Sequence, residues 1–191
     1  MLATTLTLSL PPWVRDMDLP APLAHLTDRM EFVLDLAMRN VDRGTGGPFA
    51  AAVFEQDSGR LISVGVNRVV PENTSLAHAE VLAIGLAQST LRTYDLGGPS
   101  RPRLQLVSSS QMCAMCLGAV VWSGVGEVAY STTSGDVIAT LGFDEGPTPP
   151  DYSHQLALRG ISVVAGVMRD QGLEVLRCYV TSGGIVYNAH H

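Results

Sequence analysis

The spacing of hydrophobic side chains predicts a long helix near the start of the chain. Over residues 28–44, apolar side chains recur every three or four positions, which is the period of one helix face. They are Met30, Val33, Leu34, Ala37, Met38 and Val41. Thr27 can cap the first turn, and Gly44 can end the helix in the left-handed conformation. We expect this helix to pack one face on a core.

Shorter hydrophobic stretches follow, and their lengths suit a sheet covered by helices. Residues 49–55 and 60–67 flank a polar segment, "QDSG", that suits a turn, so they predict a β-hairpin. Alternation of strands and helices then predicts one three-layer α/β domain. Strands are expected at 104–109, 127–132 and 161–166, and helices at 76–91, 113–124, 134–143 and about 170–178.

The composition favours a single domain that acts on a small substrate. The chain has 191 residues, 46% of them hydrophobic, which is enough to bury the core of one domain over 1–191. Its net charge of -6 opposes binding to the phosphates of nucleic acid. All twelve basic residues are Arg, so Schiff-base chemistry on a lysine is excluded.

The N-terminus lacks the basic start of a secretory signal, because no Lys or Arg precedes Arg15. No apolar run approaches the length that crosses a membrane. We therefore expect a cytoplasmic protein without disulfides, with residues 1–22 as an N-terminal extension.

Two cysteines lie three positions apart, at Cys113 and Cys116, just after a run of serines. On a helix this spacing puts both thiols on one face, and the N-terminus of the helix favours their thiolate forms. Ser109 or Ser110 is expected to cap that helix. The spacing alone leaves three interpretations open: two metal ligands, a redox pair, or two small buried side chains.

A second signal comes from His78 and Glu80, near the start of the helix expected at 76–91. Residues two apart on a regular helix diverge by about 200°, so both cannot ligate one ion. We expect His78 to be the ligand, with Glu80 turned toward the open side of the ion. One His and two Cys leave a fourth tetrahedral position for water, as in catalytic zinc sites.

Together these residues match the H-x-E and C-x-x-C signature of zinc-dependent base deaminases. The signature has a proline before the first cysteine, where this chain has Met112. Met can adopt the same backbone angles at an entropic cost, so this departure concerns the local geometry. We expect a catalytic Zn²⁺ bound by His78, Cys113 and Cys116, with Glu80 as the proton carrier.

The resemblance to a known family extends well beyond the metal motif. The chain resembles bacterial guanine deaminases of the cytidine-deaminase-like zinc family, and within it the branch that also accepts the triazine ammeline. The stretches that carry the resemblance are "GGPFAAAVF" at 46–54, "GVNRVV" at 65–70, "AHAE" at 77–80, "CAMCLGAVVWSGV" at 113–125, "GFDEGP" at 142–147 and "GIVYNA" at 184–189.

The resemblance implies roles for four further residues. Asn67 would hydrogen-bond the base, Phe49 and Trp122 would line the pocket, and His78 would also border the substrate. Glu145 would be a second catalytic carboxylate, facing the amino edge of the base. Gln111 departs from the family, which commonly has Glu there.

The resemblance also implies a fold, a reaction and an assembly. The fold would be a three-layer α/β/α arrangement with a mixed five-stranded sheet. The reaction would be the hydrolysis of guanine to xanthine and ammonia. The assembly would be a homodimer without nucleic-acid or membrane partners, with the C-terminal tail, residues 180–191, near the active site.

Simpler alternatives exist for each residue. Phe49 and Trp122 lie in apolar stretches, where most aromatic residues belong to the core. Asn67 can be a turn former, and Glu145 can belong to an ordinary exposed acidic turn. Cys178 has no partner in the sequence and suits buried packing.

Other functions also fit the motif. A deaminase of ammeline, another aminopurine or a purine nucleoside would keep the same zinc ligands. A tRNA adenosine deaminase would need a basic surface, which this acidic chain lacks. A non-catalytic zinc protein would have no use for Glu80 beside an open coordination position.

Overall fold

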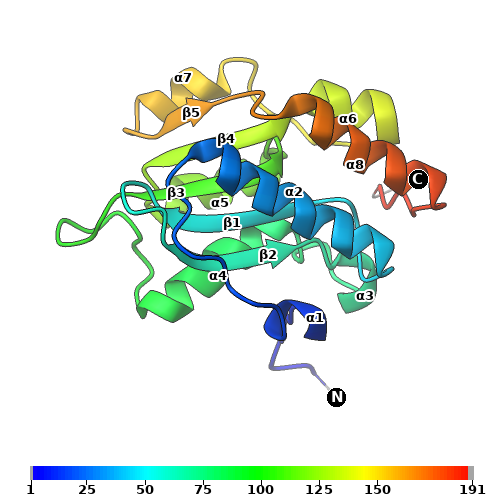
Figure 1. The fold of residues 1–191 in the computed structure, drawn as a ribbon, viewed down its shortest axis with the longest axis horizontal. Helices are drawn as coiled ribbons and strands as arrows, with labels where there is room; N and C mark the ends of the chain where they lie inside the picture. The colour runs from blue at the N-terminus through cyan, green and yellow to red at the C-terminus, as the bar shows by residue number, and fades with distance from the viewer. Residues whose placement is uncertain (1, 189–191) are drawn as a thin grey trace.

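A mixed five-stranded sheet forms the centre of the molecule, in the order β2-β1-β3-β4-β5 (Figure 1). The computed structural model describes residues 2–188. The strands are β1 (Ala50–Glu55), β2 (Leu61–Val66), β3 (Leu104–Ser110), β4 (Glu127–Thr132) and β5 (Ser162–Val164). β1 pairs antiparallel with β2 and β3, whereas β3–β4 and β4–β5 are parallel. The predicted three-layer fold with a mixed five-stranded sheet is confirmed.

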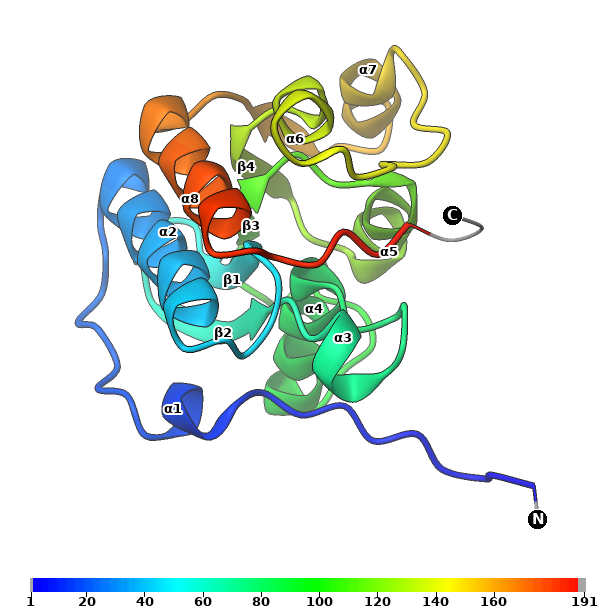
Figure 2. The same ribbon diagram turned by 90° about the vertical axis from the view of Figure 1, so that its right-hand side faces the viewer.

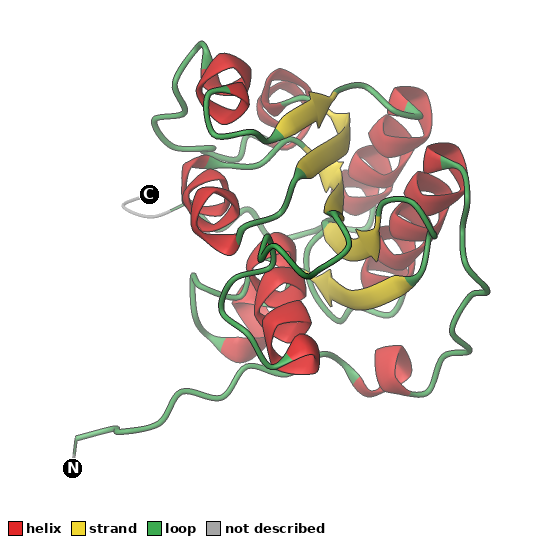
Figure 3. Cartoon of the chain, turned by 90° about the vertical axis from the view of Figure 1, so that its left-hand side faces the viewer, coloured by secondary structure: helices red, strands yellow, loops and turns green. Residues whose placement is uncertain are grey.

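Helices cover both faces of this sheet (Figures 2 and 3). They are α1 (Pro12–Arg15), α2 (Leu26–Asp42), α3 (Val69–Glu72), α4 (Ala79–Leu91), α5 (Ala114–Ser123), α6 (Ser134–Leu141), α7 (Tyr152–Ala157) and α8 (Arg169–Thr181). α2 and α8 lie side by side on one face, and α4 and α5 cover the other (Figure 2). Each interface has its own apolar core, one centred on Leu106 and Val120 and one on Phe54 and Leu36.

The boundaries of the first long helix differ by two residues from the prediction. α2 begins at Leu26, with His25 in the extended N-cap position, so Thr27 lies inside the helix and does not cap it. The apolar face starts earlier than the cap signal because Leu26 also packs against the core. Gly44 does follow the helix end with a φ of 60°.

The expected helix caps at the cysteine pair are also wrong. Ser109 and Ser110 belong to the buried strand β3, and the N-cap of α5 is Cys113 itself, with extended backbone angles. β3 runs further than its hydrophobic stretch because its serines satisfy hydrogen bonds inside the sheet. Ser109 accepts from the Ala50 N–H, and Ser110 bonds to Thr132.

The short helices α1, α3 and α7 are absent from the predicted pattern, because four to six residues are too few to show a helical period. No helix within residues 2–188 combines the length and apolar character needed to cross a membrane. The chain after α8 passes over the ends of the central strands toward α5, from one face of the sheet to the other (Figure 2). Residues 189–191 of the predicted tail lie outside the described part.

Candidate active site

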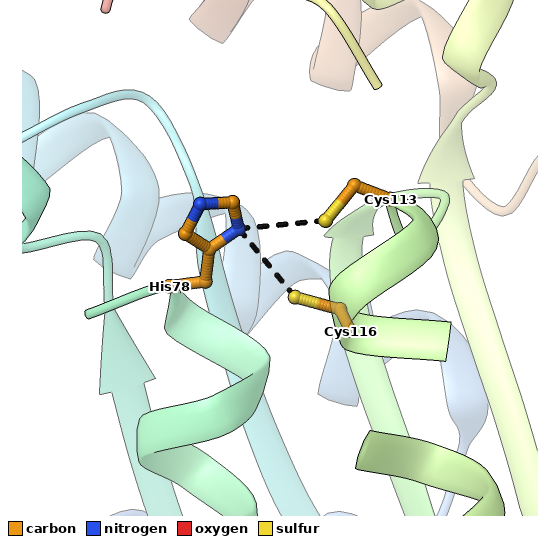
Figure 4. A group of neighbouring side chains, drawn as sticks. All are labelled: His78, Cys113 and Cys116. Carbon is orange, nitrogen blue, oxygen red and sulfur yellow. Dashed lines mark hydrogen bonds between the residues drawn. The ribbon is translucent and has the colours of Figure 1, made fainter. Parts of the chain in front are cut away.

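Three potential metal ligands meet where two helices begin, at the carboxyl-terminal side of the sheet. The ligand atoms of His78, Cys113 and Cys116 all lie within 4.8 Å of one another. The Nδ1 atom of His78 is 3.5 Å from each Sγ atom (Figure 4). His78 is the N-cap of α4, Cys113 is the N-cap of α5, and Cys116 lies in the first turn of α5. Both helix N-termini therefore point their positive ends toward the ligands.

The geometry of α4 explains how His78 and Glu80 serve one site. His78 has an extended backbone, with φ of -71° and ψ of 149°, so it is not part of the helix. The divergence of residues two apart on a helix therefore does not apply to this pair. Glu80 lies in the first turn of α4 and is buried beside the ligands.

Two buried side chains hold the carboxyl group of Glu80. Ser108 Oγ donates to its Oε1 at 3.4 Å, and Cys116 Sγ donates to its Oε2 at 3.4 Å. Burial raises the pKa of Glu80, and the nearby Cys113 thiolate adds to this shift. Glu80 is therefore in an environment that favours accepting and keeping a proton.

The two thiols differ in acidity. Hydrogen bonds from Cys116 and His78 lower the pKa of Cys113 to about 4, despite burial. The pKa of Cys116 is raised by its hydrogen bond to Cys113 and by burial. A cation bound by both sulfur atoms would favour ionisation of both thiols.

The donor set fits zinc. One imidazole and two thiolates suit Zn²⁺ and suit Mg²⁺ or Ca²⁺ poorly, because those ions prefer oxygen ligands. Within residues 2–188, no other group of three or more His, Cys, Asp and Glu side chains lies close enough together to hold a metal ion. Three protein ligands leave one tetrahedral position open, which is the pattern of catalytic rather than structural zinc.

A cavity of about 220 Å³ lies against the ligand group. Six of the predicted site residues line it: Phe49, Asn67, His78, Glu80, Cys113 and Glu145. Cys116 lies behind them and is fully buried. The structure therefore brings the metal ligands, both carboxyl groups and the residues predicted to bind the base, Asn67 and Phe49, to one cavity.

Asn67 directly follows β2 and is 1% exposed. Its Nδ2 donates to the Tyr187 hydroxyl at 2.7 Å, and its Oδ1 accepts from the Val69 N–H at 3.3 Å. The amide keeps a second N–H and a second lone pair available for a ligand. Asn67 can thus present both a donor and an acceptor to the cavity.

An aromatic wall closes one side of the cavity. Phe49 packs edge-on against Phe143 with ring centroids 5.7 Å apart, and Phe143 contacts Tyr187 at 4.7 Å. Tyr187 and Asn188 come from the C-terminal tail, where Asn188 accepts from the Asp144 N–H at 2.8 Å. The sequence analysis predicted Phe49 as a pocket residue and named the stretches 142–147 and 184–189, but it did not single out Phe143, Tyr187 or Asn188.

Glu145 lies in the loop after α6 and lines the cavity. Burial raises its pKa to about 8, and the charges of Cys113 and Glu80 contribute to the shift. The carbonyl of Glu145 accepts from the Ala114 N–H at 2.9 Å, which ties this loop to the start of α5. Glu145 is therefore a half-buried residue of the cavity wall and not an ordinary exposed acidic turn residue.

Trp122 does not line this cavity, so the prediction that it lines the pocket is wrong for a single copy of the chain. Its side chain is 86% exposed near the end of α5. It lines a separate hollow beside the loop at 147–152. The helical period explains the error, because residues six positions apart on α5, Cys116 and Trp122, point in different directions.

Comparisons with known proteins agree with the metal-binding part of this arrangement. The model of the cytidine and deoxycytidylate deaminase zinc-binding region matches residues 25–132. A guanine deaminase from Bacillus subtilis (strain 168) is 38% identical over 110 residues, which are 58% of this chain and 65% of that protein. The chain thus spans just under two thirds of that relative.

Solved structures match over almost the full length. The guanine deaminase from Nitrosomonas europaea is 46% identical with a TM-score of 0.89, covering 95% of this chain and 99% of that one. A structure in complex with 2,6-diaminopurine is 47% identical with a TM-score of 0.90, covering 98% of each chain.

Proposed function

The chain belongs to the family of cytidine and deoxycytidylate deaminases that share this zinc-binding region, and from that premise we propose that it hydrolyses guanine to xanthine and ammonia. The observation that carries the proposal is the cavity that a His-Cys-Cys group with an open coordination position shares with the carboxyl groups of Glu80 and Glu145. The full-length similarity to a guanine deaminase supports guanine as the base.

Glu80 is the residue that moves protons in this proposal. Zinc held by His78, Cys113 and Cys116 would supply the Lewis acidity that lowers the pKa of water toward neutrality. The Glu80 carboxylate takes a proton from the attacking water, whose oxygen bonds to C2 of guanine, and delivers that proton to the adjacent ring nitrogen. C2 is then tetrahedral, and its bond to the exocyclic amine breaks once the amine is protonated, which releases ammonia.

Glu145 assists the departure of the amine. A carboxyl group with a pKa near 8 is protonated at pH 7 and can donate a hydrogen bond or a proton to the leaving nitrogen. Zinc adds positive charge and lowers this pKa, which moves the group toward the range where it can both donate and accept.

We expect Glu145→Gln to lower kcat for guanine by about 10²- to 10³-fold with zinc retained, since the amide keeps the shape but cannot transfer a proton. Steady-state kinetics on the zinc-loaded variant measures the change. Asp144→Asn is the matched control, because its side chain accepts from the Gly146 N–H and an amide oxygen can do the same. Equal losses in both variants would contradict a specific role of Glu145.

Asn67 and Phe49 orient the base. The free donor and acceptor of Asn67 suit the amide-like edge of guanine, where N–H and C=O groups alternate. Phe49 offers an apolar ring beside the plane of the base. In this proposal Asn67 and Phe49 bind the base, and Glu80 and Glu145 act at its reacting carbon, C2.

A substrate panel tests guanine against the other bases. The zinc-loaded chain is assayed for ammonia release with guanine, ammeline, guanosine, adenine, cytosine and cytidine. We expect guanine to give the highest kcat/KM. A higher value for cytosine or adenine would contradict the assignment of the base, although the hydrolytic chemistry would stand.

We further propose that two copies of the chain associate through α4 and α5, which pack side by side (Figure 2). Between Ala114 and Ser123, α5 has no charged residue, and the only charge in α4 is the buried Glu80. Trp122 is 86% exposed on this surface. Glycine inside a helix lowers its stability, yet Gly85 and Gly118 have open space where a Cβ would lie. No contact within the chain requires glycine at these positions, whereas a second copy packed closely on this surface would.

The dimer is tested by light scattering of the purified protein at micromolar concentration. We expect a dimer for the wild type and a monomer for Trp122→Arg, because a charge in an apolar contact is costly to desolvate. Tyr94→Arg is the control, because Tyr94 is 87% exposed on the loop after α4. A wild-type monomer would contradict the proposal.

We also propose a cytoplasmic location. Cys113 and Cys116 must stay reduced to bind zinc, and the chain's three cysteines are free thiols.

A further inference from the structure

The side chain of Asn40 links the two segments that carry the base-binding residues. Asn40 lies on α2 and is completely buried. Its Nδ2 donates to the carbonyl of Gly47 and to the carbonyl of Asn67, at 2.9 Å each. Gly47 precedes the segment of Phe49, so one amide group fixes the spacing between the two sides of the cavity.

The segments meet so closely that only glycine fits. A Cβ on Gly46 would lie 1.8 Å from the Asn67 carbonyl oxygen and 2.7 Å from Asn40 Nδ2. A Cβ on Gly47 would lie 3.0 Å from Asn67 Oδ1. The backbone of residues 46–47 thus packs directly on Asn67, and a small shift of this segment would displace the Asn67 side chain.

The remaining polar atom of Asn40 continues the network toward the N-terminal segment. Its Oδ1 accepts from the Thr45 hydroxyl at 2.7 Å, and that hydroxyl accepts from Trp13 Nε1 at 3.1 Å. Arg68 donates to the carbonyl of Thr45. Every polar atom of the Asn40 amide is therefore used, and the chain of bonds ends in α1.

Trp13 is anchored independently of this hydrogen bond. Its ring centroid lies 5.6 Å from the Arg43 guanidinium carbon, and its neighbour Val14 is buried in the apolar cluster that includes residues of α2 and β2. The N-terminal segment is thus fixed beside the end of α2, and its indole N–H donates to the Thr45 hydroxyl. An indole N–H that is fixed in this way can hold the Thr45 hydroxyl in one orientation.

We infer that Trp13, Thr45 and Asn40 are positioning residues for base recognition, and that the N-terminal segment sets the affinity of the pocket for its base without touching it. This inference rests on the proposed role of Asn67 in binding guanine. A network that orients Asn67 acts on binding and leaves the proton transfers of Glu80 unaffected, so it changes KM rather than kcat.

Thr45→Val and Trp13→Phe test the inference. Thr45→Val keeps the shape and removes the bonds of the hydroxyl to Asn40 and to Trp13, and Trp13→Phe keeps an aromatic ring and removes only the indole bond. We expect KM for guanine to rise about three- to tenfold in Trp13→Phe, the effect of losing one buried hydrogen bond, and at least as much in Thr45→Val, with kcat within about twofold of wild type in both. Thr45→Ser, which retains the hydroxyl, is expected to restore KM. Tyr94→Phe, at an exposed position of the loop after α4, is the control and should keep the wild-type KM.

Hydrogen exchange measured by mass spectrometry provides a readout that needs no turnover. In Thr45→Val, the amides of segments 45–49 and 66–69 are expected to exchange faster than in wild type, while those of α5 are unchanged. Unchanged exchange in these segments, or a wild-type KM in both variants, would overturn the inference. A wild-type chain that does not turn over guanine would contradict the proposed function instead, and the exchange result would still decide the positioning role.

Discussion

Replacing Glu80 with Gln is expected to remove nearly all turnover of guanine and to leave the zinc content of the chain unchanged. Gln has the same shape and can still accept from Ser108, so the pocket should keep its structure. It cannot accept the proton of the attacking water or return it to the ring nitrogen. Because Glu80 acts in more than one proton transfer, we expect kcat to fall by at least about 10³-fold.

The measurement combines steady-state kinetics with the zinc content per chain by mass spectrometry. Glu31→Gln, at an exposed position of α2, is the control for the loss of one carboxylate. A Glu80→Gln variant that retains zinc and more than a tenth of the wild-type kcat would show that another group carries the proton. Loss of zinc in this variant would contradict the assignment of Glu80 as a residue outside the ligand set.

Replacing Cys116 with Ser is expected to abolish both zinc binding and turnover. Cys116 is fully buried, so the ion cannot recruit water in its place without opening the core. Mutation of residues that only hydrogen-bond the ligands of a metal site typically reduces metal affinity by about 10- to 100-fold. Loss of a thiolate ligand should reduce the affinity for zinc by more than that. The melting temperature should also lose its dependence on added zinc, since only a chain that binds the ion is stabilised by it.

Cys178→Ser is the matched control for this change. Cys178 is a free, half-buried thiol on α8 and is not part of the ligand group. We expect it to retain wild-type zinc and kcat. Equal zinc content in the Cys116 and Cys178 variants would contradict the ligand set proposed for this chain.

The sequence predicted those parts of the site that depend on local patterns. The spacing of Cys113 and Cys116, and the adjacency of His78 and Glu80, reflect two helix starts, which is why residue types alone could locate them. The first long helix follows from hydrophobic periodicity, and the strands follow from short apolar stretches, so these elements were also predictable. The extended backbone of His78 was not predictable from the sequence. It allows His78 and Glu80 to face the same site, which residues two apart on a regular helix could not do.

The parts that failed or were missed depend on contacts between distant segments. Trp122 shares the apolar helix of the cysteines, and only the packed structure shows that it faces outward. Tyr187 reaches Asn67 across 120 positions of the chain. Asn40 lies on the expected helix as an ordinary polar residue, and its role emerges only when the Gly46–Gly47 segment folds against Asn67.

The most direct test of the central claim is the conversion of guanine to xanthine by the chain before and after zinc is removed and restored. Xanthine and ammonia are measured together. We predict equimolar products from the zinc-loaded chain, no turnover after chelation, and recovery when zinc is added back. Zinc-loaded, folded chain that releases neither xanthine nor ammonia from guanine would contradict the account.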